Sequence, residues 1–130
     1  MAPKKTQRPL SPHLSVYKFP LTMMLSMIHR ITGAALYFGT ALLVWWLIAL
    51  ASGGEAFATV TWFMGTPIGL LIMVGYTWAL FHHMVGGIKH FLWDFGKAFE
   101  LDTVELVAKL ATAIPIILTI LVWAVGLGMA

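Results

Sequence analysis

The sequence predicts an all-α membrane protein with three transmembrane helices. Of its 130 residues, 60% are hydrophobic and only 10% are charged, whereas an ordinary soluble domain has about 25% charged residues. Three stretches, 31–54, 56–88 and 110–130, contain no Asp, Glu, Lys or Arg. A membrane-spanning helix needs roughly 20 apolar residues, so each stretch is long enough to cross a bilayer. A soluble helical protein is the alternative, and three such stretches argue against it.

The chain divides into an N-terminal segment over 1–21 and a three-helix transmembrane domain over 22–130. The first helix is predicted near 22–52, because Pro20 suits a first helical turn and the sequence SGGE at 52–55 breaks the chain. The second helix is predicted near 62–92 and the third near 107–128, after the lysines that follow the second span. The absence of cysteine excludes disulfides, thiolate metal sites and cysteine nucleophiles.

Positive charges lie on one side of the predicted spans. The connection at 53–66 has no Lys or Arg. Five of the eight basic residues precede or open the first helix: Lys4, Lys5, Arg8, Lys18 and Arg30. The other three lie near the connection between the second and third helices: Lys89, Lys97 and Lys109. Because cytoplasmic loops of membrane proteins are enriched in Lys and Arg, we expect a cytoplasmic N-terminus and a periplasmic C-terminus. The net charge of +3 reflects this topology and indicates no nucleic-acid partner.

Two polar clusters interrupt the apolar pattern. In SMIHRITGA, 26–34, helical spacing places Ser26, His29 and Arg30 on one side of the first helix. In FHHMVGGIKHFLWDFG, 81–96, residues seven apart share a face, so one stripe holds His83, Gly87, His90 and Asp94 and the neighbouring stripe holds His82, Gly86, Lys89 and Trp93.

The second cluster favours a haem ligand. With Lys89 at the membrane boundary, His83 lies six residues, about 9 Å, inside the membrane, where ionisable side chains are rare and face a partner or cavity. An imidazole with a glycine one turn away suits haem iron, because a flat macrocycle can then approach the backbone. Zinc is disfavoured because no partner ligands complete a tetrahedral set. A hydrogen bond to a neighbouring helix is the plainer alternative, and spacing alone does not choose between His82 and His83.

Three motifs in order closely resemble the cytochrome b membrane-anchor subunits of succinate dehydrogenase, respiratory complex II. They are RPLSPHLSVYKFP at 8–20, SMIHRITG at 26–33 and HMVGGIKHFLWDFG at 83–96. In that family the first histidine of H-x-x-x-G-[IL]-[RK]-H ligates haem b, which implies that His83 is the axial ligand and His82 is not. The family usually has Arg at the position of Lys89, so no bidentate contact is implied there.

The resemblance also implies roles for the polar residues around the ligand. Ser26 and Arg30 would line a ubiquinone site, where their hydrogen-bond donors stabilise negative charge that develops on the quinone oxygens. His29, Arg30 and His90 would surround the haem propionates, and Asp94 would orient His90 or Arg30 or serve a proton path. Plainer interpretations stay open: a snorkelling Arg30, a Ser26 bonded to a helix carbonyl, and an interfacial Asp94.

Electron transfer by this chain requires other subunits. No other histidine is expected at the depth of His83, so the second axial ligand is expected from a second membrane-anchor subunit. The resemblance implies a four-subunit enzyme of the bacterial inner membrane, with a flavoprotein subunit, an iron–sulfur subunit and two anchors that pass electrons from succinate to ubiquinone. This chain would be one anchor, surrounded by membrane lipids and not catalytic alone, with His13 and Tyr17 docking against a soluble neighbour. The alternatives are the anchor of a related quinol:fumarate reductase and a purely structural anchor without haem.

Overall fold

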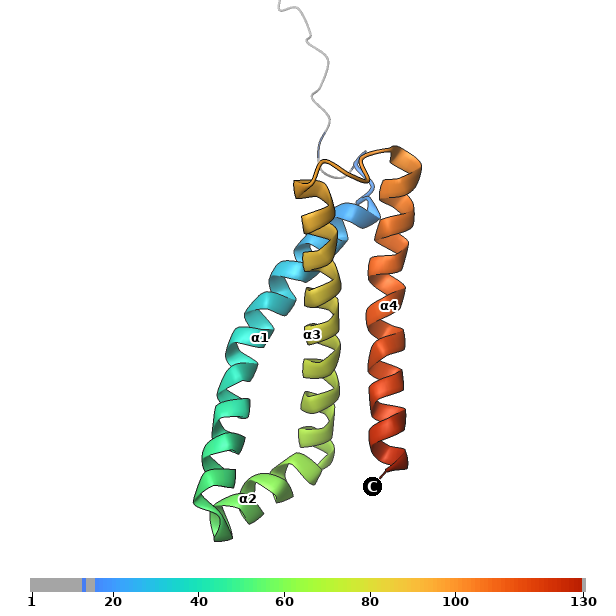
Figure 1. Ribbon diagram of the computed structural model, residues 1–130. Coiled ribbons are helices and arrows are strands. Elements are labelled where there is room, and N and C mark those ends of the chain that lie inside the picture. Colours follow the sequence, from blue (N-terminus) through green and yellow to red (C-terminus); the bar gives the residue numbers. More distant parts are fainter. Residues whose placement is uncertain (1–12, 14–15, 130) are drawn as a thin grey trace, which may run out of the picture.

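The computed structural model describes His13 and residues 16–129, and all long regular elements in this part of the chain are helices (Figure 1). They are α1 (Leu21–Ser52), α2 (Gly54–Gly65), α3 (Pro67–Asp94) and α4 (Leu101–Gly128). Three of them, α1, α3 and α4, are long and apolar enough to span a membrane. The predicted all-α architecture with three apolar spans is therefore confirmed.

The helix α2 was not expected as a separate element. The second span was predicted to begin near residue 62, but α3 begins at Pro67. Thr66 ends α2 and caps α3, since its hydroxyl accepts a hydrogen bond from the backbone N–H of Gly69 at 3.1 Å. Pro67 then occupies the first position of α3, where its missing N–H costs nothing. At the other end of α2, Gly53 has a φ of 65°, a left-handed conformation that favours glycine.

The connection between α3 and α4 is a tight turn over residues 95–100. The N–H of Lys97 donates to the carbonyl of Leu92 and that of Gly96 to Trp93, which is the hydrogen-bond pattern of a Schellman motif. Gly96 has the positive φ of 69° that this motif needs. The third span was predicted to begin near 107, whereas α4 begins six residues earlier, at Leu101. The first turns of α4 carry charged residues, so they are helical although they lie outside the apolar stretch.

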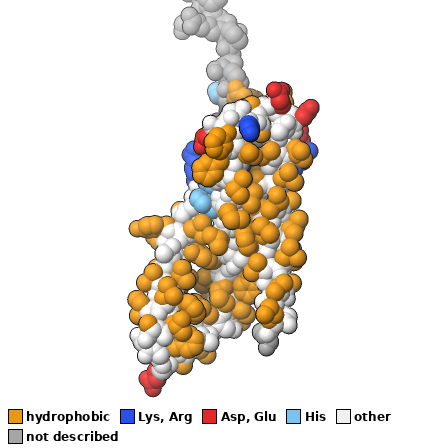
Figure 2. Space-filling model, viewed as in Figure 1, with side chains coloured by type: hydrophobic (Ala, Val, Ile, Leu, Met, Phe, Trp, Pro, Cys, Tyr) orange, Lys and Arg blue, Asp and Glu red, His pale blue; other side chains and the backbone are white. Residues whose placement is uncertain are grey.

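The bundle buries little of its own apolar surface. Its buried cluster is small and consists of Leu25 of α1 and Ala108 and Ala111 of α4, with the partly buried Val85 of α3 packed against it. Most large apolar side chains are exposed instead and cover the outside of the bundle (Figure 2). In a membrane protein such a surface faces lipid or other subunits, so the fold agrees with three bilayer crossings.

The two ends of the bundle differ in charge. The beginning of α1 and the α3–α4 connection lie at one end, whereas α2 and the end of α4 lie at the other (Figure 1). Charged side chains gather at the first end, and Figure 2 shows acidic atoms alone at the second, where α2 carries Glu55. The helix α3 packs against both α1 and α4, and α1 diverges from α3 toward α2.

Candidate histidine site between α1 and α3

Two histidines from different helices stack on each other where α1 and α3 pack together. The ring centroids of His29 and His83 lie 4.0 Å apart, and the ring planes differ by only 10°. His29 Nε2 is 3.1 Å from the carbonyl oxygen of His83, and His83 Nδ1 is 3.1 Å from the carbonyl oxygen of His29. A carbonyl oxygen can only accept, so each ring nitrogen is the donor. The hydrogen bonds between the two residues are therefore reciprocal.

These hydrogen bonds assign the tautomer of the neutral rings. His83 donates from Nδ1, which leaves the lone pair on Nε2, and His29 donates from Nε2, which leaves the lone pair on Nδ1. A histidine that ligates a metal ion typically donates its other ring N–H to a carbonyl or carboxylate. His83 therefore has the bonding pattern of a ligand that binds through Nε2.

Each ring also lies against a glycine of the opposite helix. A methyl group added at Gly86 would overlap the His29 ring, and one added at Gly33 would lie 2.9 Å from Cε1 of His83. At Gly87, one turn after His83, a Cβ would meet no described atom within 4 Å apart from its chain neighbours and the backbone of its own helix. The backbone on that side of His83 is open to a flat ligand.

His29 and His83 lie at the same level of the bundle, which corrects the expectation that no other histidine matches the depth of His83. Counting residues along α3 gave no information about where α1 crosses it. The correction does not make His29 a second axial ligand. Stacked rings present their nitrogens side by side, an arrangement that would not let both imidazoles hold one haem iron.

His90 completes a group of three imidazoles. Its ring is half-buried and lies edge-on to His29, with 5.2 Å between centroids, and edge-on to Trp93 at 5.5 Å. Within the described part of the chain, no carboxylate forms an ion pair with any of these histidines. The sequence-predicted residues His29, His83 and His90 are therefore brought together.

Among the described residues, the hydroxyls of Ser26 and Thr22 in α1 make no hydrogen bond, unlike those of three other residues of this helix. Thr32, Thr40 and Ser52 each donate to a carbonyl of their own helix at 2.8–3.0 Å. Ser26 is half-buried and makes no such bond, and Arg30 is exposed and forms no ion pair, among the residues that the structure describes. Both side chains keep their donors available to a neighbouring molecule.

Three other predicted residues lie at the same end of the bundle. Asp94 is exposed at the last position of α3, and no ion pair joins it to His90 or Arg30. His13 and Tyr17 are exposed before α1. Within the part of the chain that the structure describes, no hydrogen bond or ion pair joins any of the three to the histidine group.

The neighbouring stripe of α3 faces the interior of the bundle. His82 and Lys89 are each only 4% exposed. Both ring nitrogens of His82 and Nε1 of Trp93 are buried without a hydrogen-bond partner among the described residues. Lys89 Nζ lies 4.6 Å from the centroid of the Trp93 ring, a cation–π contact. His82 and His83, which spacing left equivalent, thus have different surroundings.

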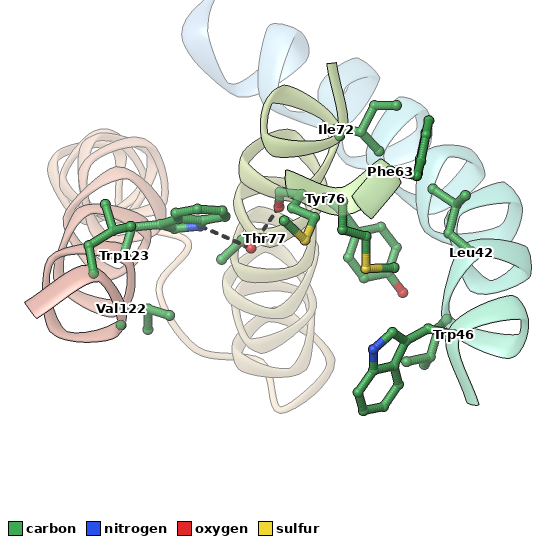
Figure 3. Close-up of a pocket in the computed structure, with 15 residues that line it drawn as sticks. Leu42, Trp46, Phe63, Ile72, Tyr76, Thr77, Val122 and Trp123 are labelled. Carbon is green, nitrogen blue, oxygen red and sulfur yellow. Dashed lines mark hydrogen bonds between the residues drawn. The ribbon is translucent and has the colours of Figure 1, made fainter. Parts of the chain in front are cut away.

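A hollow of about 600 Å³ lies at the opposite end of the bundle (Figure 3). Its wall is almost entirely apolar, and the indole N–H of Trp123 donates to the hydroxyl of Thr77 at 3.3 Å beside it. The labelled residues come from all four helices: Leu42, Trp46, Phe63, Ile72, Tyr76, Thr77, Val122 and Trp123. None of the described residues that line it is a histidine or is charged, so this hollow and the histidine group are separate features.

Comparison with known proteins identifies the family. The sequence matches the family model described as succinate dehydrogenase/fumarate reductase transmembrane subunit over residues 4–122. It is 38% identical to the succinate dehydrogenase cytochrome b556 subunit of Paracoccus denitrificans over 114 residues, which are 88% of each chain. The chain belongs to this family.

Other relatives agree. The cytochrome b556 subunit of Rickettsia felis is 36% identical over 117 residues, covering 90% of this chain and 91% of the relative. The cytochrome b560 subunit of Reclinomonas americana is 31% identical over 121 residues, covering 89% and 84%. The family confirms a membrane subunit of succinate dehydrogenase, an enzyme complex in which this subunit is not catalytic alone. The bacterial relatives and the three apolar helices fit a bacterial inner membrane.

The contacts made by Gly33 and Gly86 were not predicted from the sequence. Gly86 was placed on the stripe of His82, but its contact is with His29 of α1. The signal was present in the motifs ITG and HMVGG, where a small residue follows each histidine after one turn. Only the pairing of the two helices shows that each glycine makes room for the other helix's ring.

Proposed function

We propose that this chain binds haem b through Nε2 of His83 and contributes Ser26 and Arg30 to a ubiquinone site, as one of the two membrane anchors of succinate dehydrogenase. The observation that carries the proposal is the hydrogen bond from His83 Nδ1 to the carbonyl of His29, which leaves Nε2 as the free nitrogen. The name cytochrome b, shared by the relatives, supports a haem.

The residues present fit one axial haem ligand. His83 supplies the nitrogen, and Gly87 leaves the adjacent backbone uncovered. No group of three His, Asp or Glu side chains that could hold a metal ion occurs among the described residues. In this proposal the remaining iron ligands would come from outside this chain. A porphyrin provides four, and a histidine of the second anchor subunit would provide the last. The bound haem supplies reversible one-electron chemistry.

The quinone role is supported by unused donors. The Ser26 hydroxyl and the Arg30 guanidinium lie within one turn of each other on α1, and neither is satisfied by the described residues. The apolar hollow does not include them, so the other walls of a quinone site would come from neighbouring subunits. Arg30 stabilises negative charge on a quinone oxygen without losing its proton, while Ser26 donates a hydrogen bond.

The charge distribution supports a cytoplasmic N-terminus and a periplasmic C-terminus. Lys18, Lys97 and Lys109 lie at the end of the bundle that holds the beginning of α1, while α2 has no basic residue. The histidine group is then on the cytoplasmic side, where an iron–sulfur subunit, itself bound to a flavoprotein subunit, can deliver electrons.

The haem assignment is tested with absorption spectra of the purified complex. The reduced b-type bands should vanish in His83→Ala and persist in His82→Ala, the same change at the adjacent histidine. Bands that persist in His83→Ala would disprove the assignment. A wild-type complex without any b-type bands would instead indicate a purely structural anchor.

The quinone site is tested with turnover. In Arg30→Ala we expect succinate–ubiquinone turnover to fall by about 10²–10³-fold, because the variant loses a donor that stabilises negative charge on the quinone oxygen. Succinate oxidation by a water-soluble acceptor should be unchanged. Ser26→Ala should lower turnover less, and Ser52→Ala, in the same helix but bonded to Ile48, should have no effect. Equal turnover in Arg30→Ala and wild type would remove Arg30 from the site.

A further inference from the structure

We propose that His29, Gly33 and Gly86 position His83, so that its ring plane and tautomer are fixed before a haem binds. The four residues are called the His–Gly clasp below. The proposal rests on the proposed function of His83 as an axial ligand. It gives the two glycines a role, and it gives His29 one that differs from contact with the propionates.

The clasp is reciprocal in both its contacts and its hydrogen bonds. Each imidazole occupies the space above the glycine of the other helix, and each donates to the carbonyl of the other histidine at 3.1 Å. The stacked rings, 4.0 Å apart, restrict rotation of one another. A ring that is held by a hydrogen bond, a stacked neighbour and a close backbone has little freedom to change its plane.

The hydrogen bond from Nδ1 of His83 sets which nitrogen is available. Its acceptor is a main-chain carbonyl, so the hydrogen must lie on Nδ1 and the lone pair on Nε2. The carbonyl of His29 also accepts from the buried hydroxyl of Thr32 at 3.0 Å. The acceptor is thus held within α1 and does not depend on a bound ligand.

The hydrogen bond from His29 likewise sets which of its ring nitrogens is free. Its Nε2–H is used by the carbonyl of His83, so the nitrogen that a neutral His29 offers to other groups is the acceptor Nδ1. An anionic carboxylate needs donors, which Arg30 and His90 can supply on this side. His29 therefore acts on the site through His83.

The two glycines are required because no side chain fits between the rings and the backbone. An alanine at Gly86 overlaps the His29 ring, and its Cβ would lie 3.1 Å from Nε2, the atom that bonds to His83. An alanine at Gly33 presses on Cε1 of His83 itself. In both cases the atom in the way belongs to a side chain, so the ring moves while the helix stays folded.

The experiment compares Gly33→Ala, Gly86→Ala and Gly75→Ala in the assembled complex. Gly75 is in α3 and has no neighbour within 4 Å, so it controls for the effect of alanine in a helix. We expect the first two variants to shift the g values of the oxidised haem in electron paramagnetic resonance and to weaken haem binding by about 10- to 100-fold, as for other groups that support a metal ligand. Gly75→Ala should match wild type.

A double variant tests whether Gly86 acts through His29. His29→Ala should shift the g values by itself, and adding Gly86→Ala should cause no further shift, because the ring with which the methyl collides is gone. Additive shifts, or unchanged g values in Gly33→Ala and Gly86→Ala, would overturn the proposal. A wild-type complex that lacks haem would instead refute the proposed function, and the two failures are distinguishable.

Discussion

Replacing His82 with leucine should stabilise the fold of this chain. The ring of His82 is 4% exposed, and neither nitrogen has a hydrogen-bond partner among the described residues. Leucine has a similar volume and no polar atom, so it removes the unpaired groups without opening a large cavity.

The magnitude follows from the two nitrogens. A neutral imidazole has one donor and one acceptor, and a buried group left without a partner costs about 1–3 kcal/mol. Two such groups give a gross gain of about 2–6 kcal/mol. In a bilayer the unfolded reference state also finds partners, which reduces hydrogen-bond effects to a fraction of their expected size. We therefore expect a net gain in the free energy of unfolding of about 1–3 kcal/mol.

The assay is titration of the purified chain with sodium dodecyl sulfate in mixed micelles, followed by circular dichroism. Thr119→Val is the matched control, because it is also a buried change from polar to apolar. The Thr119 hydroxyl donates to the carbonyl of Pro115 at 2.7 Å, so this variant should lose about 0.5–1 kcal/mol. A loss of stability in His82→Leu would refute the reasoning and show that its nitrogens are bound to a partner or to water.

Three further predictions concern other parts of the chain. Because the sequence has no cysteine, the single variants Lys97→Cys and Glu55→Cys each report which side of the membrane their residue faces. An impermeant maleimide added to whole cells should label the cysteine at position 55 and not the one at position 97. The opposite labelling pattern would mean that the orientation is inverted. Gly39→Ala places a methyl group on the Tyr76 ring and should lower the melting temperature of the complex; an unchanged melting temperature would mean that the ring moves freely. Lys109→Ala removes an exposed 2.8 Å ion pair with Glu105 and should change the free energy of unfolding by less than about 0.5 kcal/mol, measured in the same detergent titration.

The helices could be predicted from the sequence because hydropathy and helix-terminating residues are local signals. The span predicted near 22–52 corresponds to α1, and both ends carry the expected proline and glycine. The helix α2 was missed because residues 54–61 fell in the predicted connection, and only 62–65 were joined to the following span. What separates the two helices is the cap formed by Thr66 and Gly69, a single hydrogen bond that hydropathy does not register.

The site could be predicted only one helix at a time. Periodicity placed Ser26, His29 and Arg30 on one side of α1, and His83 and His90 on one side of α3. It gave neither the rotation of the two helices nor their relative height, so the contact of His29 with His83 and Gly86 was unexpected. The burial of Lys89 against Trp93 was missed for the same reason, since an inward-facing lysine depends on the neighbouring helices.

The short helix α2 sets how far apart α1 and α3 stand at its end of the bundle. Its 12 residues extend about 18 Å at 1.5 Å per residue, and it enters the arrangement as a rigid strut (Figure 1). Removing one turn from this strut would draw the two long helices together and shrink the apolar hollow, while the imidazoles near the opposite membrane face kept their spacing. We therefore expect that the apolar hollow can be engineered without disturbing the stacking of the imidazoles.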